Sequence, residues 1–386
     1  MLMQTLLVSV FLITFLLCFA TYFLFPVILV ILGRVYPFRI QRENIIPSVS
    51  VIIAAYNEEQ HIAEKIRNTL ALDYPAEHIE ILIGSDGSTD NTPRIVEQLK
   101  DEKIRFFNFR ENRGKTSVQN DLAREAGGDI LVFTDAASFL PRNAIKNLVR
   151  NFADNRVGCV AGRLRFVDTD QNLTTKSQGL YWRYEVKIRE LESRLGSLIG
   201  VDGPLYAVRK EYYIPLQANI ISDLMTPLLV LKQGKKVILE PDALVDEEPT
   251  KQGGHEFNTR RRITLRGLVG IFSHPDIINP VKHPLLGVQI FAHKILRWFV
   301  GPLVILNTLV LFTLVFLDFR PAEFLLPVYL FFFISAFFGW IFEKAGKKIK
   351  ILTIPYYFCL VNLAATFGIV DFFRGKQAVT WKTIRD

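Results

Sequence analysis

Three short apolar runs, each followed by polar or acidic residues, organise the first part of the chain. With their polar ends, the runs cover residues 49–59, 79–88 and 129–136, and β-branched side chains are frequent in them. Helix-like segments separate the runs, and this alternation is typical of βαβ units with a parallel sheet. Ligands of such sheets collect outside the carboxyl ends of the strands. We therefore expect the three polar clusters to lie together at one edge of a sheet.

The segments between these runs have helical signals. Residues 58–70 carry apolar side chains at every fourth position, which predicts an amphipathic helix. Residues 88–100 begin with capping residues and an early proline, and residues 113–126 end at a glycine, so two more helices are expected. Residues 104–109 form a further apolar run between them. This order indicates a doubly wound half-domain of the α/β class.

The region after residue 150 has a less regular pattern. Strands are expected at residues 157–165 and 237–241 and within 201–209, and helices at residues 180–195 and 225–234. A basic segment, residues 259–267, comes next. These elements extend the α/β domain.

Long apolar segments lie at both ends of the chain, which is 50% hydrophobic with a mean hydropathy of +0.23. The segments are residues 5–32, 298–317, 324–342 and 351–370. Each is close to or above the ~20 residues that cross a bilayer, and backbone bonding in lipid requires them to be helical. A cleaved signal peptide would need a basic start and a small-residue cleavage site, which residues 1–33 lack. We expect one uncleaved N-terminal anchor and about three C-terminal transmembrane helices.

Residues 285–297 combine apolar side chains with His293, Lys294 and Arg297. One interpretation is an amphipathic helix in the membrane interface, with its basic groups towards the headgroups. The other is an extension of the following span. The sequence leaves both open.

Lysine and arginine in short flanking loops indicate the orientation of the spans. They predict a cytoplasmic catalytic region and an outer N-terminus, in an inner or cell membrane of the bacterial type. The residues behind this prediction are Arg34, Arg39, Arg42, Lys344, Lys347, Lys348 and Lys350. Three C-terminal spans would, however, place four basic residues outside: Arg374, Lys376, Lys382 and Arg385. Either the last segment is re-entrant or the charge rule fails there.

The formal net charge is +8, but several basic residues flank the spans, where anionic headgroups account for them. No nucleic-acid motif accompanies the charge, so no nucleic-acid partner is expected. The three cysteines have neither metal-ligand spacing nor a disulfide framework. The predicted parts are an anchor (1–33), a linker (34–47), a catalytic domain (48–270), an interfacial segment (271–297), C-terminal transmembrane helices (298–372) and a tail (373–386).

Five ordered motifs span the middle of the chain: VIIAAYNEE, GSDGSTD, NRGKTSVQN, VFTDA, and GPLYAVRKE followed by ISD. In this order and spacing the chain resembles the membrane-bound, inverting family 2 glycosyltransferases. The resemblance covers roughly residues 47–267, with one leading anchor and several trailing spans. It implies a glycosyltransferase-A fold, a Rossmann-like mixed sheet that binds a nucleotide-diphosphate sugar, here expected to be UDP-linked.

The resemblance implies donor-binding roles for Tyr56, Glu58, Asp86, Gly114 and Lys115. The first two would lie against the nucleoside, and Asp86 would accept a hydrogen bond from the base. Gly114 would allow close backbone approach, with Lys115 beside the nucleotide. Each role has a plainer alternative, such as a turn at Asp86 or a solvated surface position for Lys115.

For the reaction itself, the resemblance implies that Asp135 holds a metal, that Asp223 is the general base and that Arg262 lies near the diphosphate. Asp135 and Asp223 could instead cap helices, and the arginines around Arg262 could bind lipid headgroups. Two departures from the family pattern bear on these roles. Ala137 stands where the metal motif usually has a second acid, and residues 259–263 lack the usual glutamine and tryptophan. The second departure weakens a cellulose-like or chitin-like polymerising activity.

Weaker acceptor candidates are Asp202, which is otherwise a turn residue, and Tyr181, Trp182 and Glu185, which are otherwise core positions of a helix. Mg²⁺ or Mn²⁺ remains expected, because phosphate oxygens and water can complete the shell of a hard cation.

The expected reaction is transfer of the sugar to a hydroxyl of a membrane-associated saccharide or lipid-linked acceptor. A carboxylate must take the proton of that hydroxyl, and one displacement inverts the anomeric configuration. Two alternatives remain: a processive synthase that exports its polymer through the spans, and a binding protein that has lost activity.

Overall fold

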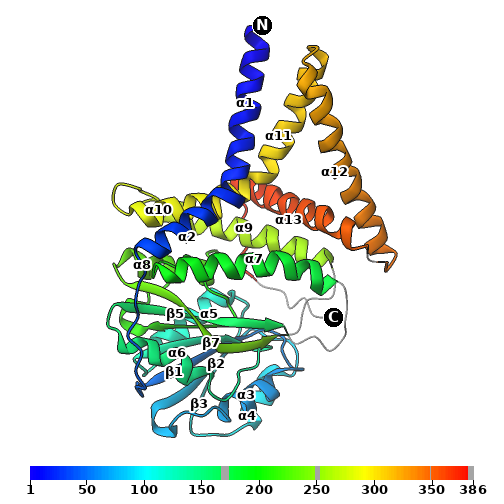
Figure 1. Ribbon diagram of the computed structural model, residues 1–386. Helices are drawn as coiled ribbons and strands as arrows, with labels where there is room; N and C mark the ends of the chain where they lie inside the picture. Colours follow the sequence, from blue (N-terminus) through cyan, green and yellow to red (C-terminus); the bar gives the residue numbers. More distant parts are fainter. Residues whose placement is uncertain (167–173, 248–252, 348, 381–386) are drawn as a thin grey trace.

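A computed structural model of the chain describes residues 1–166, 174–247, 253–347 and 349–380. The side chains of residues 174–181, 253–255 and 350 are outside this description, so Tyr181, Lys382 and Arg385 are not placed. Figure 1 shows two parts: a globular α/β domain, and a set of long helices that stands on one side of it.

The domain is built on one mixed sheet, as the family resemblance implied, whereas the hydrophobic pattern alone predicted a parallel one. Its seven strands lie in the order β3-β2-β1-β4-β6-β5-β7. Strands β3, β2, β1 and β4 are parallel, β6 runs antiparallel to both β4 and β5, and β7 is parallel to β5. The strands are β1 (Val49–Ala55), β2 (Ile79–Asp86), β3 (Ile104–Phe109), β4 (Ile130–Asp135), β5 (Val157–Phe166), β6 (Leu205–Arg209) and β7 (Lys236–Glu247).

The pairing register of the parallel strands brings the three polar clusters to one edge of the sheet. Ala54 of β1 is paired with Gly84 on one side and with Asp135 on the other. Asp86 is paired with Phe109, the last residue of β3. Because these four strands are parallel, their carboxyl ends lie side by side.

Two apolar layers cover the sheet. Alternate residues of β1 face opposite sides, so Val51 and Ile53 belong to one core and Ile52 to the other. The first core is covered by α3 (Ile62–Leu70), α4 (Thr92–Gln98) and α6 (Ala144–Val149), and the second by α5 (Lys115–Glu125) and part of α8 (Ser222–Lys232). Short 3₁₀ turns are η2 (Ala76–His78), η3 (Arg150–Ala153) and η4 (Lys210–Tyr212).

Helix α3 begins later than the predicted start at residue 58. Asn57 takes a left-handed conformation with a φ of 52°, which a continuing helix does not allow. The backbone N–H of Glu58 donates to Thr92 Oγ1 at 2.8 Å. Residues 56–61 therefore form a loop at the sheet edge and not a first helical turn.

The N-terminal apolar segment forms one bent helix. Helix α1 (Leu2–Phe19) continues through the π-helical turn η1 (Ala20–Leu24) into α2 (Phe25–Val35). Figure 1 shows α1 standing away from the globule and α2 inclined towards α7 (Thr174–Arg194), where Leu29 packs with Leu191. A π-turn followed by Pro26 is a usual cause of such a bend.

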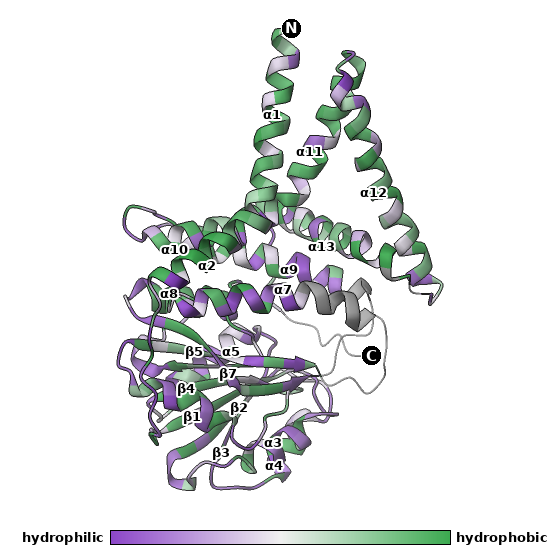
Figure 2. Cartoon of the chain, viewed as in Figure 1, coloured by the Kyte–Doolittle hydropathy of each residue, from purple (hydrophilic) through white to green (hydrophobic). Residues whose placement is uncertain are grey.

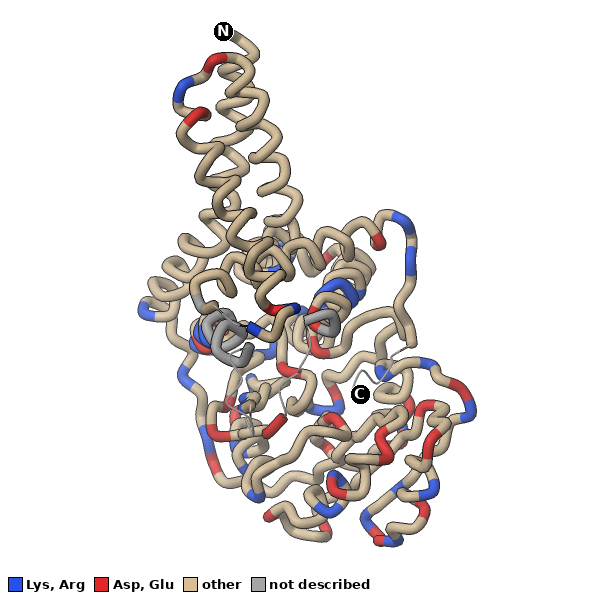
Figure 3. Tube along the Cα trace, turned by 90° about the vertical axis from the view of Figure 1, so that its right-hand side faces the viewer, with Lys and Arg blue, Asp and Glu red and all other residues tan. Residues whose placement is uncertain are grey.

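The C-terminal half supplies three more long apolar helices, so within the described residues four segments are long and apolar enough to cross a membrane. Helix α10 (Pro284–Gln289), the π-turn η5 (Ile290–Ile295) and α11 (Leu296–Phe316) form one continuous run. Helices α12 (Arg320–Lys344) and α13 (Lys350–Phe373) follow. Segment 285–297 is therefore continuous with the next span, as one of the two interpretations held. Figure 2 shows the apolar character of α1, α11 and α12, and Figure 3 shows that charged residues concentrate in the globular domain.

Helix α13 differs in direction from the other long helices. In Figure 1 it crosses beneath α1 and α11 and lies over α9 (Gly253–Ser273). At the crossing, a Cβ on Gly368 would stand 2.7 Å from the carbonyl oxygen of Arg261. After α13 the tail returns to the globular domain. The carbonyl of Val379 lies so close to Gly114 that a Cβ on this glycine would collide with it. The described part of the tail thus lies on the same side as the domain, which favours a last segment that does not cross.

Candidate active site

Asp86 closes the second strand and holds the loop that follows β3. Its side chain is fully buried. Oδ1 accepts the backbone N–H of Arg113 at 2.9 Å, and Oδ2 accepts the N–H of Gly114 at 2.8 Å. Gly114 has a φ of 89°, a conformation that favours glycine. Asp86 and Gly114, both predicted to bind the sugar donor, thus lie together, and the Asp86 carboxylate fixes the shape of this loop.

Tyr56 and Glu58 lie on the loop after β1, beside the loop after β2. Glu58 is buried, and its carboxylate contacts His61 Nδ1 at 3.2 Å. The N–H of Asn57 donates to Ser88 Oγ at 3.1 Å, which joins the two loops. Asn57 and Ser88 were not singled out in the sequence, although both lie inside the quoted motifs.

Asp135 ends β4 and forms an ion pair with Lys115, the first residue of α5. Both side chains are partly exposed, at 27% and 20%. The two residues were predicted separately for metal and nucleotide, and the structure places them in direct contact.

A buried lysine is hydrogen-bonded to residues at this edge of the sheet. Lys65 of α3 is fully buried, and its Nζ donates to Thr134 Oγ1 at 2.8 Å and to the carbonyl of Ser138. Burial lowers the pKa of Lys65 to about 7, while the nearby Asp135 acts in the opposite direction. Sequence analysis missed Lys65, although its place beside Ile62 and Ile66 on the apolar face of α3 was a usable signal.

The residues around Asp135 form at most a partial metal site. In the described part of the chain, no group of three or more His, Cys, Asp or Glu side chains converges. Ala137 is buried and adds no side-chain oxygen. The Lys115 ammonium shows that a positive charge is accommodated at the Asp135 carboxylate. This donor set fits a Mg²⁺ or Mn²⁺ ion that takes its remaining ligands from a diphosphate and water.

Asp223 lies in the first turn of α8, close to the Lys115–Asp135 pair. Its Oδ2 and the Nζ of Lys115 are 3.3 and 3.7 Å from the position that a Cβ on Gly203 would occupy. Burial raises the pKa of Asp223; Lys115 and Arg266 oppose this effect, and Asp135 adds to it. The N-cap residue of α8 is Ile221, and no side-chain capping bond is present there. The helix-cap interpretation of Asp223 is therefore not supported.

The arginines of α9 point to different neighbours. Arg261 pairs with Asp371 of α13, and Arg260 donates to Glu256 at 2.8 Å. Burial lowers the pKa of Arg262, and the charge of Asp223 acts in the opposite direction.

Arg266, which the sequence analysis did not select, is more deeply engaged than Arg262. It is buried and donates to Thr116 Oγ1 and to the carbonyls of Ala218 and Ile220, at 2.8, 3.0 and 2.6 Å. It ties α9 to α5 and to the loop before α8. An arginine one helical turn beyond Arg262 was the available signal.

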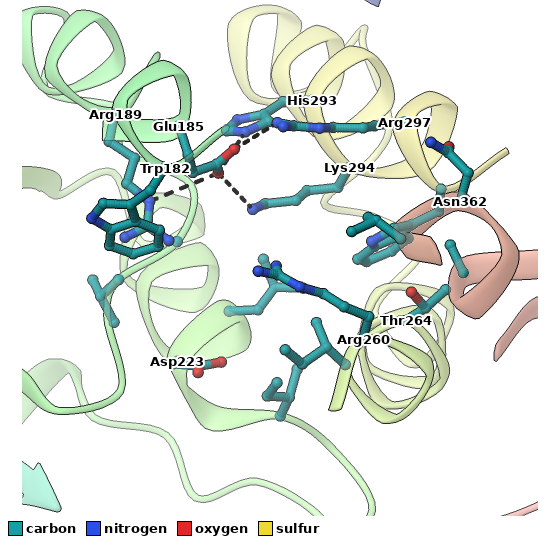
Figure 4. A pocket seen from close by; sticks show the side chains of 18 of the residues that line it. Trp182, Glu185, Arg189, Asp223, Arg260, Thr264, His293, Lys294, Arg297 and Asn362 are labelled. Atoms are coloured by element: carbon teal, nitrogen blue, oxygen red, sulfur yellow. Dashed lines mark hydrogen bonds and ion pairs between the residues drawn. The ribbon is translucent and has the colours of Figure 1, made fainter. Parts of the chain in front are cut away.

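A cavity of about 150 Å³ opens beside Asp223, between the globular domain and the long helices (Figure 4). Trp182 and Glu185 of α7 line it, as do Arg260 of α9 and Lys294 of η5. Two weak acceptor candidates, Trp182 and Glu185, thus share a cavity with the predicted base. Asp202 does not line it; this carboxylate forms an ion pair with Arg189.

Glu185 is the centre of a buried ionic network in the cavity wall. It accepts from Arg297 Nη1 at 2.6 Å and lies 3.1 Å from His293 Nε2, while His293 Nδ1 is 2.8 Å from Glu192. Burial alone would raise the pKa of Glu185, but Arg297, His293 and Lys294 together hold it well below its usual range. The network joins α7 to the helix that continues as α11.

Comparison with known proteins agrees with this architecture. The family model described as Glycosyl transferase family 2 matches residues 50–214. A beta-monoglucosyldiacylglycerol synthase of Trichormus variabilis is 27% identical over 186 residues, which cover 47% of this chain and 40% of the relative. A poly-beta-1,6-N-acetyl-D-glucosamine synthase of Staphylococcus aureus is 34% identical over 119 residues, 30% of this chain and 28% of the relative. The matches thus span less than half of these relatives.

Among solved structures, the mannosyltransferase PcManGT of Pyrobaculum calidifontis, in complex with GDP-Man and Mn²⁺, has a TM-score of 0.69 at 23% identity. The similarity covers 95% of this chain and 100% of that one, so the glycosyltransferase-A fold is shared together with the helical part. The family match, the sheet order and the four apolar helices confirm the predicted fold class. Residues 50–214 of this chain therefore resemble a glycosyltransferase family 2 domain.

Proposed function

We propose that this protein is an inverting glycosyltransferase that moves a sugar from a nucleotide-diphosphate donor to a hydroxyl of a membrane-associated acceptor. The observation that carries the proposal is the meeting of Lys115 and Asp223 at Gly203, with Asp135 paired to the same Lys115. On one side of this point lie the loops at the carboxyl edge of the sheet, and on the other lies the cavity below the long helices.

In this proposal the acceptor hydroxyl oxygen attacks the anomeric carbon as the bond to the diphosphate breaks. Asp223 takes the hydroxyl proton and must therefore be ionised. Lys115 and Arg262 stabilise the negative charge of the leaving nucleoside diphosphate. A Mg²⁺ or Mn²⁺ ion held by Asp135 would neutralise further diphosphate charge.

The donor would lie across the loops after β1, β2 and β3, with Tyr56, Glu58 and Asp86 around the nucleoside. At the edge of this site the Gly114 backbone is closely approached by the Val379 carbonyl of the tail, which only a residue without a side chain allows. The solved structure of PcManGT, which shares the fold, contains GDP-Man. We propose a UDP-linked sugar, and a panel of UDP and GDP sugars tests this choice.

The helical part supports an acceptor presented at a membrane. The apolar surfaces of α1, α11 and α12 would embed the protein, with the domain on the cytoplasmic side. A cavity of about 150 Å³ is small beside the ~300–1,000 Å³ of ordinary ligand pockets, which supports single additions over export of a polymer.

The purified full chain, incubated with Mn²⁺, a lipid extract and the donor panel, should release nucleoside diphosphate and form a glycosylated product. Asp223→Asn should abolish acceptor-dependent release. Asp276→Asn is the matched control, because Asp276 is an exposed partner of Lys232 outside the cavity. Unchanged acceptor-dependent release by Asp223→Asn would show that the base is assigned wrongly.

A further inference from the structure

Lys294 is the least compensated cation of the cavity beside Asp223. Its side chain is only 17% exposed, and its one ion pair within the described residues is a 4.0 Å contact with Glu185. That carboxylate already accepts from Arg297 at 2.6 Å and contacts His293 at 3.1 Å. The Lys294 ammonium has three donor hydrogens, so it has capacity for a further anionic partner.

The other cations that line the cavity have closer acidic partners. Arg189 pairs with Asp202, Arg260 with Glu256 and Arg297 with Glu185. Each of these carboxylates compensates the charge of one arginine. In the described part of the chain, Lys294 has only Glu185, whose single charge is already engaged by Arg297 and His293. Burying an ammonium group is unfavourable unless it is paired and hydrogen-bonded. An anion that enters the cavity would therefore compensate the charge of Lys294.

Side-chain directions place this anion near the predicted base. Figure 4 shows Lys294 and Arg260 projecting into the cavity from two helices, with Asp223 at its other end. A Cβ on Gly200 would lie 3.6 Å from Lys294 Nζ, and Gly200 lines the same cavity as Asp223. An anion on Lys294 and a hydroxyl at Asp223 can thus belong to one small headgroup.

The walls of the cavity indicate where its ligand comes from. Tyr22, Trp298 and Asn362 line it, and each belongs to one of the apolar helical segments. A ligand that reaches Lys294 therefore passes between the globular domain and the membrane helices. The volume of about 150 Å³ leaves room only for a small polar group, so the chains of a lipid would remain outside.

We propose that the acceptor of this enzyme is a lipid whose headgroup carries both a phosphate and a free hydroxyl. This inference rests on the proposed glycosyl transfer and specifies its acceptor. The phosphate binds Lys294, with Arg260 nearby, and the hydroxyl lies at Asp223. The hydroxyl oxygen bonds to the anomeric carbon, its proton passes to Asp223, and the nucleoside diphosphate leaves with the electron pair of the broken bond.

Two kinds of lipid share this chemistry: a glycerol phosphodiester such as phosphatidylglycerol, and a sugar linked to a polyprenol by a diphosphate. A neutral diacylglycerol has the hydroxyl without the phosphate. Binding to these three probes can be followed without donor, by the fluorescence of Trp182 and Trp298, with the full chain in phosphatidylcholine nanodiscs.

At least one phosphate-bearing probe should bind more tightly than dioleoylglycerol, and the stronger of the two identifies the source. Lys294→Met should weaken that binding by about 10- to 100-fold, because a hydrogen bond to a charged group is worth about 1.5–3 kcal/mol. Lys294→Arg should retain most of the affinity. Lys232→Met is the matched control, since Lys232 pairs with Asp276 outside the cavity.

Equal binding of dioleoylglycerol and the phosphate lipids, or equal affinity in Lys294→Met, would overturn the inference. Lys294→Arg keeps the test valid if the methionine variant does not fold. Transfer assays separate the two proposals. Lys294-dependent binding without any sugar transfer refutes the proposed function and leaves the lipid site in place, whereas equal transfer to dioleoylglycerol by wild type and Lys294→Met refutes only the lipid site.

Discussion

The proposed donor edge of the sheet and the proposed acceptor cavity below the long helices are built in different ways. Strands β1, β2 and β4 are neighbours in the sheet, and each donor loop directly follows its strand. The cavity, in contrast, takes its walls from α7, α8, α9, η5 and α13, which are spread over about half of the chain. Local motifs therefore describe the first region, and only tertiary packing describes the second.

Their electrostatics also differ. At the donor edge, Asp135 meets the single charge of Lys115, and both are partly open to solvent. In the cavity wall, Glu185 serves several cations at once in a buried network. A change at the donor edge should thus affect mainly the nucleotide, whereas a change in the cavity should affect mainly the acceptor. Four predictions test this division, in order of decreasing effect.

The largest effect is expected from Asp223→Asn. Loss of the general base should lower the transfer rate by about 10²- to 10⁴-fold. Donor affinity should change little, because Asp223 faces the cavity. Steady-state kinetics with varied donor and acceptor measure both quantities. A parallel loss of donor affinity would contradict the division between the two regions.

The pH dependence of transfer comes next. Burial raises the pKa of Asp223, and the reaction needs its ionised form. As pH falls through this raised pKa, the rate should fall about tenfold per pH unit, at a pH above the ordinary aspartate value of about 3.9. The affinity for the donor, measured by nucleotide titration, should not fall over the same pH range. An acidic limb at or below the ordinary value would contradict the assignment.

Gly114→Ala should selectively weaken donor binding. A side chain there would meet the Val379 carbonyl in a backbone conformation that is almost restricted to glycine, at a cost of about 1–3 kcal/mol. We expect an increase of about tenfold in donor KM and an unchanged acceptor KM. Gly234→Ala is the matched control, with a φ of 79° and nothing within 4 Å. An equal effect of both substitutions on donor KM would show that backbone strain alone is responsible.

The smallest effect concerns the support of the donor edge by Lys65. Its pKa is lowered to about 7, so between about pH 7 and the unfolded value of 10.5 the unfolded chain binds more protons. Stability should therefore rise with pH in this range, by at most about 1.4 kcal/mol per unit. Thermal unfolding at pH 7 and 9 measures the slope. Lys65→Met should lack this contribution, and an identical slope in the variant would contradict the assignment.

The sequence was a good guide where candidate site residues come directly after a strand. The pairing of Ala54 with Gly84 and Asp135 follows from parallel strands of similar length, so the donor edge was predictable. It was wrong about the start of α3, because the left-handed Asn57 belongs to the loop. It also missed Arg266, whose partners Thr116 and Ile220 are distant in sequence. Its place one helical turn beyond Arg262 was a signal, but the sequence pattern did not show these distant partners.

The amino-acid sequence by itself determined the sheet, the acidic strand ends and the four apolar helices, because alternation, helical periodicity and segment length are local properties. Only the tertiary structure decided that Asp223 and Lys115 meet at Gly203, and that Lys294 and Glu185 share a cavity with that base. It also decided that α13 lies over α9 and returns the tail to Gly114. The physical reason is that these contacts join residues far apart in the chain, and their geometry depends on how whole helices pack.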